Sequence, residues 1–143
     1  MSKFSRFMKE NKIAKENEMY APTKSLVDEN GEPLQWEFRH ITSKRDGELR
    51  DENTIDVQVT GKPGVFRPRL QSSKYIRSMI AESVVMPDLR NAELQDSYGV
   101  KTPEDLLQAM VDDPGEYTDL SAFVQKLQGF NASFEDKVEE AKK

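Results

Sequence analysis

Apolar residues in the second half of the chain recur three and four positions apart, which is the spacing of a buried helical face. Two such faces lie between residues 87 and 130, separated by glycine and proline. The first comprises Leu106, Leu107, Met110 and Val111, and the second comprises Tyr117, Leu120, Phe123, Val124 and Leu127. The pattern predicts short helices that pack against one another.

The ends of these helices are also marked in the sequence. Thr102 and Asp113 are typical N-cap residues, and each is followed by a proline, which suits the first turn of a helix. Gly129 suits the left-handed conformation that ends a helix, and Phe130 can then fold back onto the last turn. We therefore expect helices that begin after Thr102 and after Asp113, with a stop at Gly129.

The N-terminal half shows the alternation of β-strands instead. Residues 22–27 and 34–41 flank an Asn-Gly pair, which tolerates the backbone angles of a tight hairpin turn. The return strand alternates, and the side chains that share its apolar face are Leu34, Trp36, Phe38 and His40. We expect a first antiparallel hairpin with Trp36 in the core and His40 at the end of the strand.

Three further segments complete the chain. Residues 42–53 are polar and predict a short exposed helix that starts at Thr42 or Ser43. Residues 55–59 and 65–70 flank a turn of glycine and proline and predict a second hairpin, whose last strand is an edge because it contains Pro68. Residues 71–86 predict a helix that Pro87 ends. A last short helix is expected from Ser133, with inward side chains Phe134, Val138 and Ala141.

These segments predict an α+β fold that is mostly α: a bundle of short helices with one or two antiparallel β-hairpins in the N-terminal half. Residues 1–20 place Phe4, Phe7 and Met8 at helical spacing among basic residues, which predicts a flexible amphipathic segment. Residues 21–143 are expected to form a single domain, with hairpins at about 22–70 and helices at about 71–143.

Composition narrows the class of protein. A chain of 143 residues with 36% hydrophobic and 33% charged residues has room for one modest core and a strongly hydrated surface. There is no cysteine, so disulfides and thiolate metal sites are excluded. No apolar run is long enough to cross a membrane, and the N-terminus lacks the apolar stretch of a secretion signal. We expect a soluble intracellular protein.

Charge is unevenly distributed along the chain. Residues 1–15 carry five basic residues against one acid, and residues 62–77 carry five basic residues and no acid. Residues 88–143 carry thirteen acids against six basic residues. Basic and acidic regions of this kind suit the electrostatic selection of a protein partner, although a solvated surface needs no partner.

The sequence lacks the motifs of catalytic, phosphate-binding and metal-binding sites. His40 is the only histidine, so a hydrolytic triad has a single candidate base, and no Gly-x-Ser-x-Gly elbow occurs. The turn at residues 61–64 lacks the spacing of a phosphate-binding loop. Paired carboxylates such as Asp112-Asp113 lie near helix ends, where they suit caps and the helix dipole. We expect no catalytic residue, no cofactor and no metal site.

The basic segment at residues 62–77 raises the alternative of nucleic-acid binding. Phe66 and Tyr75 lie within it, and phosphate neutralisation with aromatic stacking uses such residues. Both aromatics, however, also lie where strand alternation and helical spacing place core residues, and the whole chain is acidic. We favour the structural interpretation of this segment.

Laid side by side, the segments resemble a known family. The most specific stretch is SVVMPDLRNAELQDSYGVKTPEDLL at residues 83–107, followed by PGEY at residues 114–117 and the closing GFNASFEDKVEEAKK. Over essentially its whole length the chain is similar to the XkdN-like phage tail assembly chaperones of PBSX-type prophages. The order and spacing of many ordinary motifs carry the resemblance, because no single motif is chemically diagnostic.

The resemblance implies a non-enzymatic factor of phage tail assembly. Such proteins are thought to coat the tape measure protein, keep it soluble and recruit subunits of the major tail tube protein around it. They act in the host bacterial cytoplasm and leave before the virion is finished. These properties come from the resemblance and not from composition or spacing.

A rod-like client with apolar stripes suits binding in a groove between short helices. The residues expected to line that groove are Tyr98, Met110, Tyr117, Phe123 and Leu127, with Phe4 and Phe7 as a second contact. Two other classes of function stay open, a nucleic-acid-binding regulator that uses residues 62–77 and a permanent structural subunit of the tail. Self-association also stays open, since exposed hairpin edges can pair chains.

Overall fold

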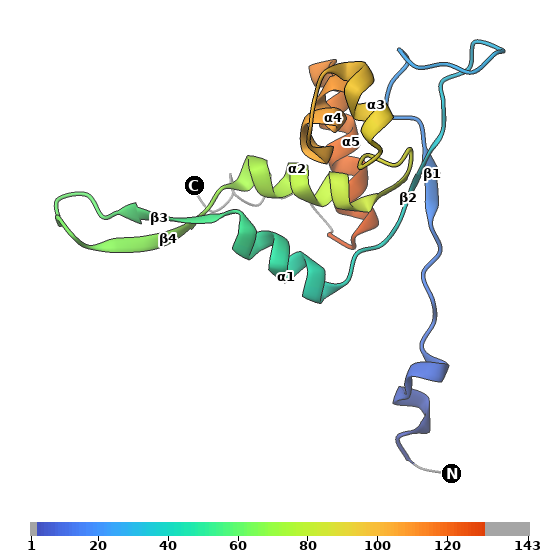
Figure 1. The fold of residues 1–143 in the computed structure, drawn as a ribbon. Helices are drawn as coiled ribbons and strands as arrows, with labels where there is room; N and C mark the ends of the chain where they lie inside the picture. Colours follow the sequence, from blue (N-terminus) through green and yellow to red (C-terminus); the bar gives the residue numbers. More distant parts are fainter. Residues whose placement is uncertain (1–2, 131–143) are drawn as a thin grey trace.

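The structure is a computed structural model that describes residues 3–130. Helices and short strands alternate along the chain (Figure 1). In order they are the 3-10 turns η1 (Ser5–Phe7) and η2 (Lys9–Asn11), β1 (Glu18–Tyr20), β2 (Trp36–Phe38), α1 (Ser43–Glu52), β3 (Thr54–Gln58), β4 (Phe66–Leu70), α2 (Ser72–Ser83), β5 (Val84–Met86), α3 (Ala92–Tyr98), α4 (Pro103–Met110) and α5 (Pro114–Leu127). The fold is α+β and rich in helix, and its sheets are small and antiparallel, which confirms the predicted fold class.

The body of the protein is a helical cluster packed on a three-stranded sheet of order β1-β2-β5. Trp36 and Phe38 of β2 are buried, as predicted, whereas Leu34, which precedes the strand, is exposed. Figure 1 shows α1 and α2 side by side, with α3, α4 and α5 grouped next to the sheet. The apolar faces predicted for α2, α4 and α5 meet in one core with β2.

The partner of β2 differs from the predicted one. Residues 18–20 form β1 and pair with β2, whereas residues 22–27 form no strand and make one isolated bridge, between Val27 and Pro33. The polar groups of this segment are occupied elsewhere. The Thr23 hydroxyl donates to Glu116 Oε1 at 2.8 Å, and the Lys24 amide donates to Glu116 Oε2 at 2.8 Å. The first hairpin was therefore wrong in its first strand, where a carboxylate of α5 accepts from the Lys24 backbone amide, a donor that a ladder would use.

The helix predicted over residues 71–86 also ends early. α2 stops at Ser83, and the next three residues form β5, which pairs with β2. Met86 precedes Pro87, and a residue before proline is disfavoured in a helix. Val84 and Val85 are β-branched and fit a strand, so the chain joins the open edge of β2 instead of completing another helical turn.

The predicted starts of α4 and α5 and the stop at Gly129 are confirmed. The Thr102 side chain accepts a hydrogen bond from the Asp105 amide at 3.1 Å, and the Asp113 side chain accepts one from the Gly115 amide at 3.0 Å. Gly129 has a φ of +95°, the left-handed conformation that glycine adopts without a steric penalty. Phe130 folds back and is partly buried against the core.

Thr42 caps α1 as predicted, with its side chain accepting from the Arg45 amide at 3.1 Å. The helix is polar and mostly accessible, but its single apolar residue, Leu49, is buried in the core. The final helix expected from Ser133 lies outside the described residues. Within residues 3–130, no helix combines the length and the apolar character that a membrane crossing requires.

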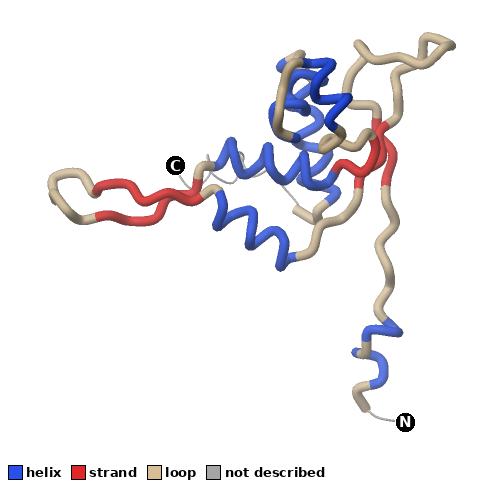
Figure 2. The backbone as a smooth tube through the Cα atoms, in the orientation of Figure 1, coloured by secondary structure: helices blue, strands red, loops and turns tan. Residues whose placement is uncertain are grey.

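Two parts of the chain project from the body (Figures 1 and 2). The segment before β1 extends away as the N-terminal arm, residues 3–17, and the β3–β4 hairpin extends in another direction beyond α1 and α2. The second hairpin is confirmed, with β3 and β4 paired antiparallel from Thr54–Leu70 to Gln58–Phe66. β1 shows that residues 18–20 belong to the sheet, while the division into a segment 1–20 and a domain 21–143 stays a prediction.

Candidate partner-binding surfaces

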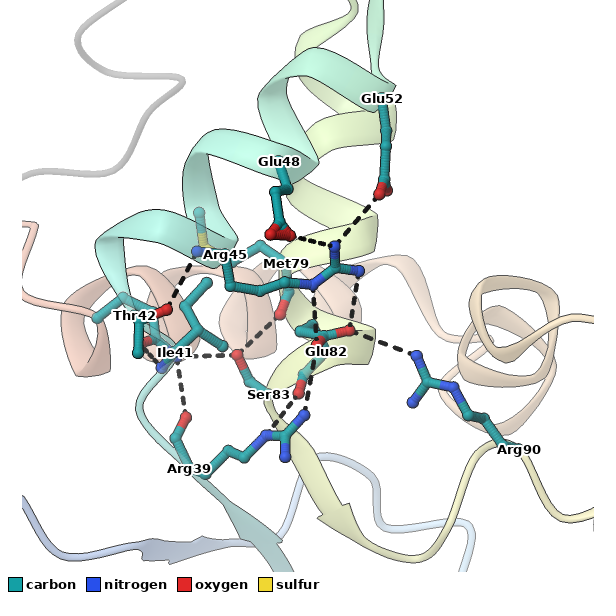
Figure 3. A network of polar contacts seen from close by, with 11 residues as sticks. Arg39, Ile41, Thr42, Arg45, Glu48, Glu52, Met79, Glu82, Ser83 and Arg90 are labelled. Atoms are coloured by element: carbon teal, nitrogen blue, oxygen red, sulfur yellow. Dashed lines mark hydrogen bonds and ion pairs between the residues drawn. The ribbon is translucent and has the colours of Figure 1, made fainter.

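A network of ion pairs around Glu82 holds the elements of the body together (Figure 3). Glu82 lies near the end of α2, and its carboxylate accepts from Arg45 of α1 at 3.1 Å. Arg39, which follows β2, and Arg90, which precedes α3, each approach the same carboxylate at 3.4 Å. One acidic side chain thereby joins two helices, the central strand and a connecting segment.

The electrostatics of this network follow from its geometry. Burial alone would raise the pKa of Glu82, but the hydrogen bond and charge of Arg45, with Arg90, outweigh burial and lower it. The same contacts raise the pKa of Arg45. Glu82 is therefore a stable anion at neutral pH, and its role is structural.

A second polar cluster joins α1 to α2. The Tyr75 hydroxyl donates to the Asp46 carboxylate, which also accepts from Arg50 at 3.0 Å. Burial raises the pKa of Tyr75, and the hydrogen bond to Asp46 and its negative charge raise it further. The Arg50 guanidinium lies 4.6 Å from the centre of the Tyr75 ring, a cation–π geometry. Tyr75 is thus a core residue, as helical spacing predicts.

Two of the seven predicted partner-binding residues come together in one cleft. Phe123 and Leu127 of α5 line a hollow of about 360 Å³. Its other lining residues are Glu18, His40 and Lys126. The floor is apolar and the rim carries one acid and one base, an arrangement that suits a side chain of an amphipathic partner.

Packing fixes the position of Phe123 in this cleft. Its ring stacks on Tyr20 of β1, with the ring centres 4.3 Å apart, and meets Phe38 edge-on at 5.3 Å. The Nδ1 atom of His40 is buried and has no hydrogen-bond partner among the described residues. The cleft therefore combines an aromatic wall with one unsatisfied polar atom.

The other predicted groove residues lie apart from this cleft. Tyr98 is at the end of α3 and exposed, Met110 is buried at the end of α4, and Tyr117 is partly buried on the first turns of α5. None of these residues lines the cleft. That they bind a partner stays a prediction.

The N-terminal arm forms two 3-10 turns and not a continuous helix. Phe4 and Phe7 both belong to the first turn, η1, with Phe4 at its N-cap. Phe7 is 85% exposed and Ile13 is 89% exposed, and Phe4 and Met8 are also exposed. Basic side chains alternate with these apolar ones. The arm thus presents apolar and basic groups together, away from the core that buries Trp36, Phe38 and Tyr75 (Figure 1).

The sequence predicted the β3–β4 hairpin but did not predict that it forms an exposed surface. Phe66, expected in the core from strand alternation, is 60% exposed, so that expectation was wrong. The hairpin is a two-stranded sheet on its own, and no described helix covers either of its faces. The segments that flank the hairpin are charged and rich in turns, so they offer no third strand to pair with it. This feature of the sequence could have indicated that the hairpin is exposed.

No metal centre is apparent in the described part of the chain, because no three histidine, aspartate or glutamate side chains between residues 3 and 130 gather closely enough to hold an ion. Of the paired acids expected near helix ends, Asp113 caps α5.

The comparisons with known proteins agree with one another. Residues 4–142 match the family model described as phage XkdN-like tail assembly chaperone protein. The chain is 29% identical over 137 residues to the phage-like element PBSX protein XkdN of Bacillus subtilis (strain 168), which covers 95% of this chain and 91% of that protein. It is also 29% identical over 120 residues to YqbN of the same strain, with 84% and 79% covered. The crystal structure of the protein YqbN has a similar fold, with a TM-score of 0.74, 24% identity and coverage of 92% of this chain and 99% of that chain.

Proposed function

The chain belongs to the family of phage XkdN-like tail assembly chaperones, and we propose that it binds the tape measure protein while a tail is being assembled. In this proposal it keeps the tape measure protein soluble and helps to recruit subunits of the major tail tube protein. It acts in the bacterial cytoplasm and is absent from the finished virion. The family is one of assembly chaperones, so the partners are phage tail proteins in general, and the tape measure and tube proteins are the specific proposal.

The observation that carries the proposal is the family match over residues 4–142. Physical support comes from the N-terminal arm, whose exposed apolar side chains lie between basic ones. A rod-like helical client with apolar stripes aggregates unless those stripes are covered. An exposed arm can cover them reversibly, because few of its side chains must leave other contacts to do so.

The cleft beside β1 is the second proposed contact. Phe123 and Leu127 supply its apolar floor, and Lys126 and Glu18 stand at its rim. A small apolar centre with a charged rim gives moderate affinity, which suits a chaperone that must later release its client. Phe123 also stacks on Tyr20, so its removal changes stability as well as binding.

Co-expression with a fragment of the cognate tape measure protein tests the proposal. We expect the wild-type chain to raise the soluble fraction of the fragment and to co-elute with it. The double variant Phe4→Ser/Phe7→Ser should lower that soluble fraction several-fold, because it removes exposed apolar surface from the arm. Val27→Ser/Leu34→Ser is the matched control, since both residues are exposed aliphatics in the loop before β2. A wild-type chain that neither solubilises nor retains the fragment contradicts the proposal.

The second measurement is the protein content of purified phage particles. A chaperone that leaves the tail should be missing from them by quantitative mass spectrometry. Stoichiometric copies in finished tails would instead favour a permanent structural subunit.

A further inference from the structure

The β3–β4 hairpin projects from the body with both of its faces accessible (Figure 2). Phe66, Val65 and Ile55 are among the exposed large apolar residues of the chain. A two-stranded hairpin of this kind gains little stability from its own pairing. Apolar side chains on such a projection are therefore open to a partner.

The register of the hairpin sorts its side chains into two faces. Ile55 lies opposite Arg69, and Val57 lies opposite Arg67. Side chains of directly opposed residues point to the same face of an antiparallel pair, as do alternate residues along one strand. One face therefore carries Ile55, Val57, Arg67 and Arg69, which we name the arginine face. The only acid of the hairpin strands, Asp56, lies on the other face.

The guanidinium groups of the arginine face lack acidic partners, in contrast to those of four arginines in the body. In the body, Arg39, Arg45 and Arg90 each form an ion pair with Glu82, and Arg50 forms one with Asp46. Arg67 and Arg69 form no ion pair with any described residue. The face thus has two arginines whose charge the rest of residues 3–130 does not neutralise.

The same positive character continues onto the body. A hollow of about 680 Å³ lies where the hairpin meets α2. Ile55 and Arg69 line it from the hairpin, and Ser72 to Lys74 line it from the start of α2. The arginine face and this hollow form one continuous surface with aliphatic and basic groups and no acid.

We propose that the arginine face of the β3–β4 hairpin docks an acidic amphipathic helix of a protein client. The helix places aliphatic side chains on Ile55 and Val57 and carboxylates on Arg67 and Arg69. The spacing matches, because neighbours on a helix surface and opposed residues on paired strands are both separated by about 5–6 Å. The inference rests on the proposed function in one respect, that the client is a tail protein.

A helix fits this surface better than a nucleic acid does. On this face two aliphatic side chains of β3 lie beside two arginines of β4, and a phosphate backbone offers no apolar stripe to cover the aliphatic row. Carboxylates on an amphipathic helix supply both the charge and the apolar contact, and arginine binds carboxylates with two parallel hydrogen bonds.

Fluorescence anisotropy with synthetic probes tests this docking on the full chain. The first probe is a three-heptad helical peptide with leucine and alanine on one face and glutamate on the other. The second has lysine in place of glutamate, and the third is a 20-base-pair DNA duplex. We expect the glutamate peptide to bind, and Arg67→Glu/Arg69→Glu to weaken it at least tenfold. Lys44→Glu/Lys101→Glu is the control, because both lysines are exposed, lie on none of the proposed surfaces and change the net charge equally. The affinity of this control for the glutamate peptide should stay within twofold of the wild type.

Several results would overturn the proposal. One is equal affinity of the glutamate peptide for the wild type and for Arg67→Glu/Arg69→Glu, with both melting at the same temperature. Another is tighter binding of DNA that the same variant abolishes, which assigns the face to nucleic acid. A third is a change of oligomeric state in that variant by light scattering, which assigns the face to a second copy of the chain.

Co-purification separates this inference from the proposed function. If the wild type and Arg67→Glu/Arg69→Glu retain the tape measure fragment equally, the docking surface is wrong while the chaperone function stands. If the wild type retains none of the fragment but binds the glutamate peptide through the arginine face, the proposed client is wrong and the surface stands.

Discussion

β2 and β4 are both short antiparallel strands with alternating aromatic or apolar residues, yet their environments are opposite. Phe38 of β2 is completely buried between Tyr20, Trp36 and Phe123. Phe66 of β4 is 60% exposed. β2 has a strand on each side and lies in the core formed with α2 and α5, whereas β4 pairs only with β3.

The difference shows what alternation can and cannot report. It tells which side chains share a face of a strand, because the strand repeats every two residues. It does not tell whether another element covers that face. In this protein the apolar face of β2 became part of the core, whereas the face of β4 that carries Phe66 is exposed and lies on the opposite side of the hairpin from the arginine face. The two strands therefore make a natural pair for mutational comparison.

Truncation of the two phenylalanines should show the largest contrast. Phe38→Ala removes a ring packed among three aromatic side chains and should cost about 3–5 kcal/mol of unfolding free energy. Phe66→Ala removes an exposed ring and should change the unfolding free energy by less than about 0.5 kcal/mol. Urea denaturation followed by far-UV circular dichroism measures both. Similar losses in the two variants would mean that the hairpin packs on the body.

Disruption of the Glu82 network should give the next largest loss of unfolding free energy. The hairpin contains no comparable network of ion pairs. Glu82→Gln removes the charge that Arg39, Arg45 and Arg90 share and should cost about 1–2 kcal/mol, given that the arginines are partly exposed. Glu52→Gln is the control, because Glu52 pairs with Arg45 at the surface and should contribute less than about 0.5 kcal/mol.

The difference in stability between the wild type and Glu82→Gln should depend on pH, because the pKa of Glu82 is lowered in the folded state. A carboxylate with a lowered folded-state pKa stabilises the fold above its unfolded pKa, about 4.3, and loses that contribution as the pH falls through the folded value. The difference in unfolding free energy between the wild type and Glu82→Gln should therefore shrink as the pH falls below about 4.3 and through the lowered folded-state pKa of Glu82. A gap that stays constant would show that packing and not charge is lost.

Removal of the Tyr75 hydroxyl should cost about 1 kcal/mol, because Tyr75→Phe breaks a buried hydrogen bond to Asp46 while Arg50 still pairs with that carboxylate. The raised pKa of Tyr75 means that the unfolded chain loses its proton first, so wild-type stability should fall above about pH 10. The stability of Tyr75→Phe should fall less steeply over the same pH range. Tyr98→Phe, at an exposed position, is the control and should match the wild type throughout.

Excision of the hairpin should show the smallest effect. Residues 56–68 can be replaced by two glycines, because Ile55 and Arg69 are directly opposite each other in the register. We expect the free energy of unfolding of the body to change by less than about 1 kcal/mol. The reason is that these strands contribute only Leu70 to the core, and Leu70 lies at its margin. A loss of several kcal/mol would contradict the separation of the hairpin from the body.

Much of the fold could be predicted because its signals are local. The caps at Thr102 and Asp113 bind amides two or three residues away, and Gly129 adopts the left-handed conformation within its own residue. β1 and β5 could not be predicted in this way. Each has three residues, and each is a strand because β2 offers it an open edge. A strand that short carries no periodicity to read.

The candidate surfaces were only partly predictable for the same reason. Phe123 and Leu127 are one helical turn apart, so their common face was visible, but the cleft also needs Glu18 and His40 from distant parts of the chain. Only the three-dimensional structure shows which arginines form ion pairs, and therefore that Arg67 and Arg69 form none with the described residues.

The sequence by itself determined where α1, α4 and α5 begin, the stop at Gly129, the apolar faces of α2, α4 and α5, and the family to which the chain is similar, because these depend on neighbours within a few positions or on their order. The tertiary structure decided where α2 ends, which strands pair with β2 and which apolar face stays open. Those outcomes depend on contacts such as that of Tyr20 with Phe123, between residues a hundred positions apart. Local pattern proposes a face, and only long-range packing determines whether it is buried.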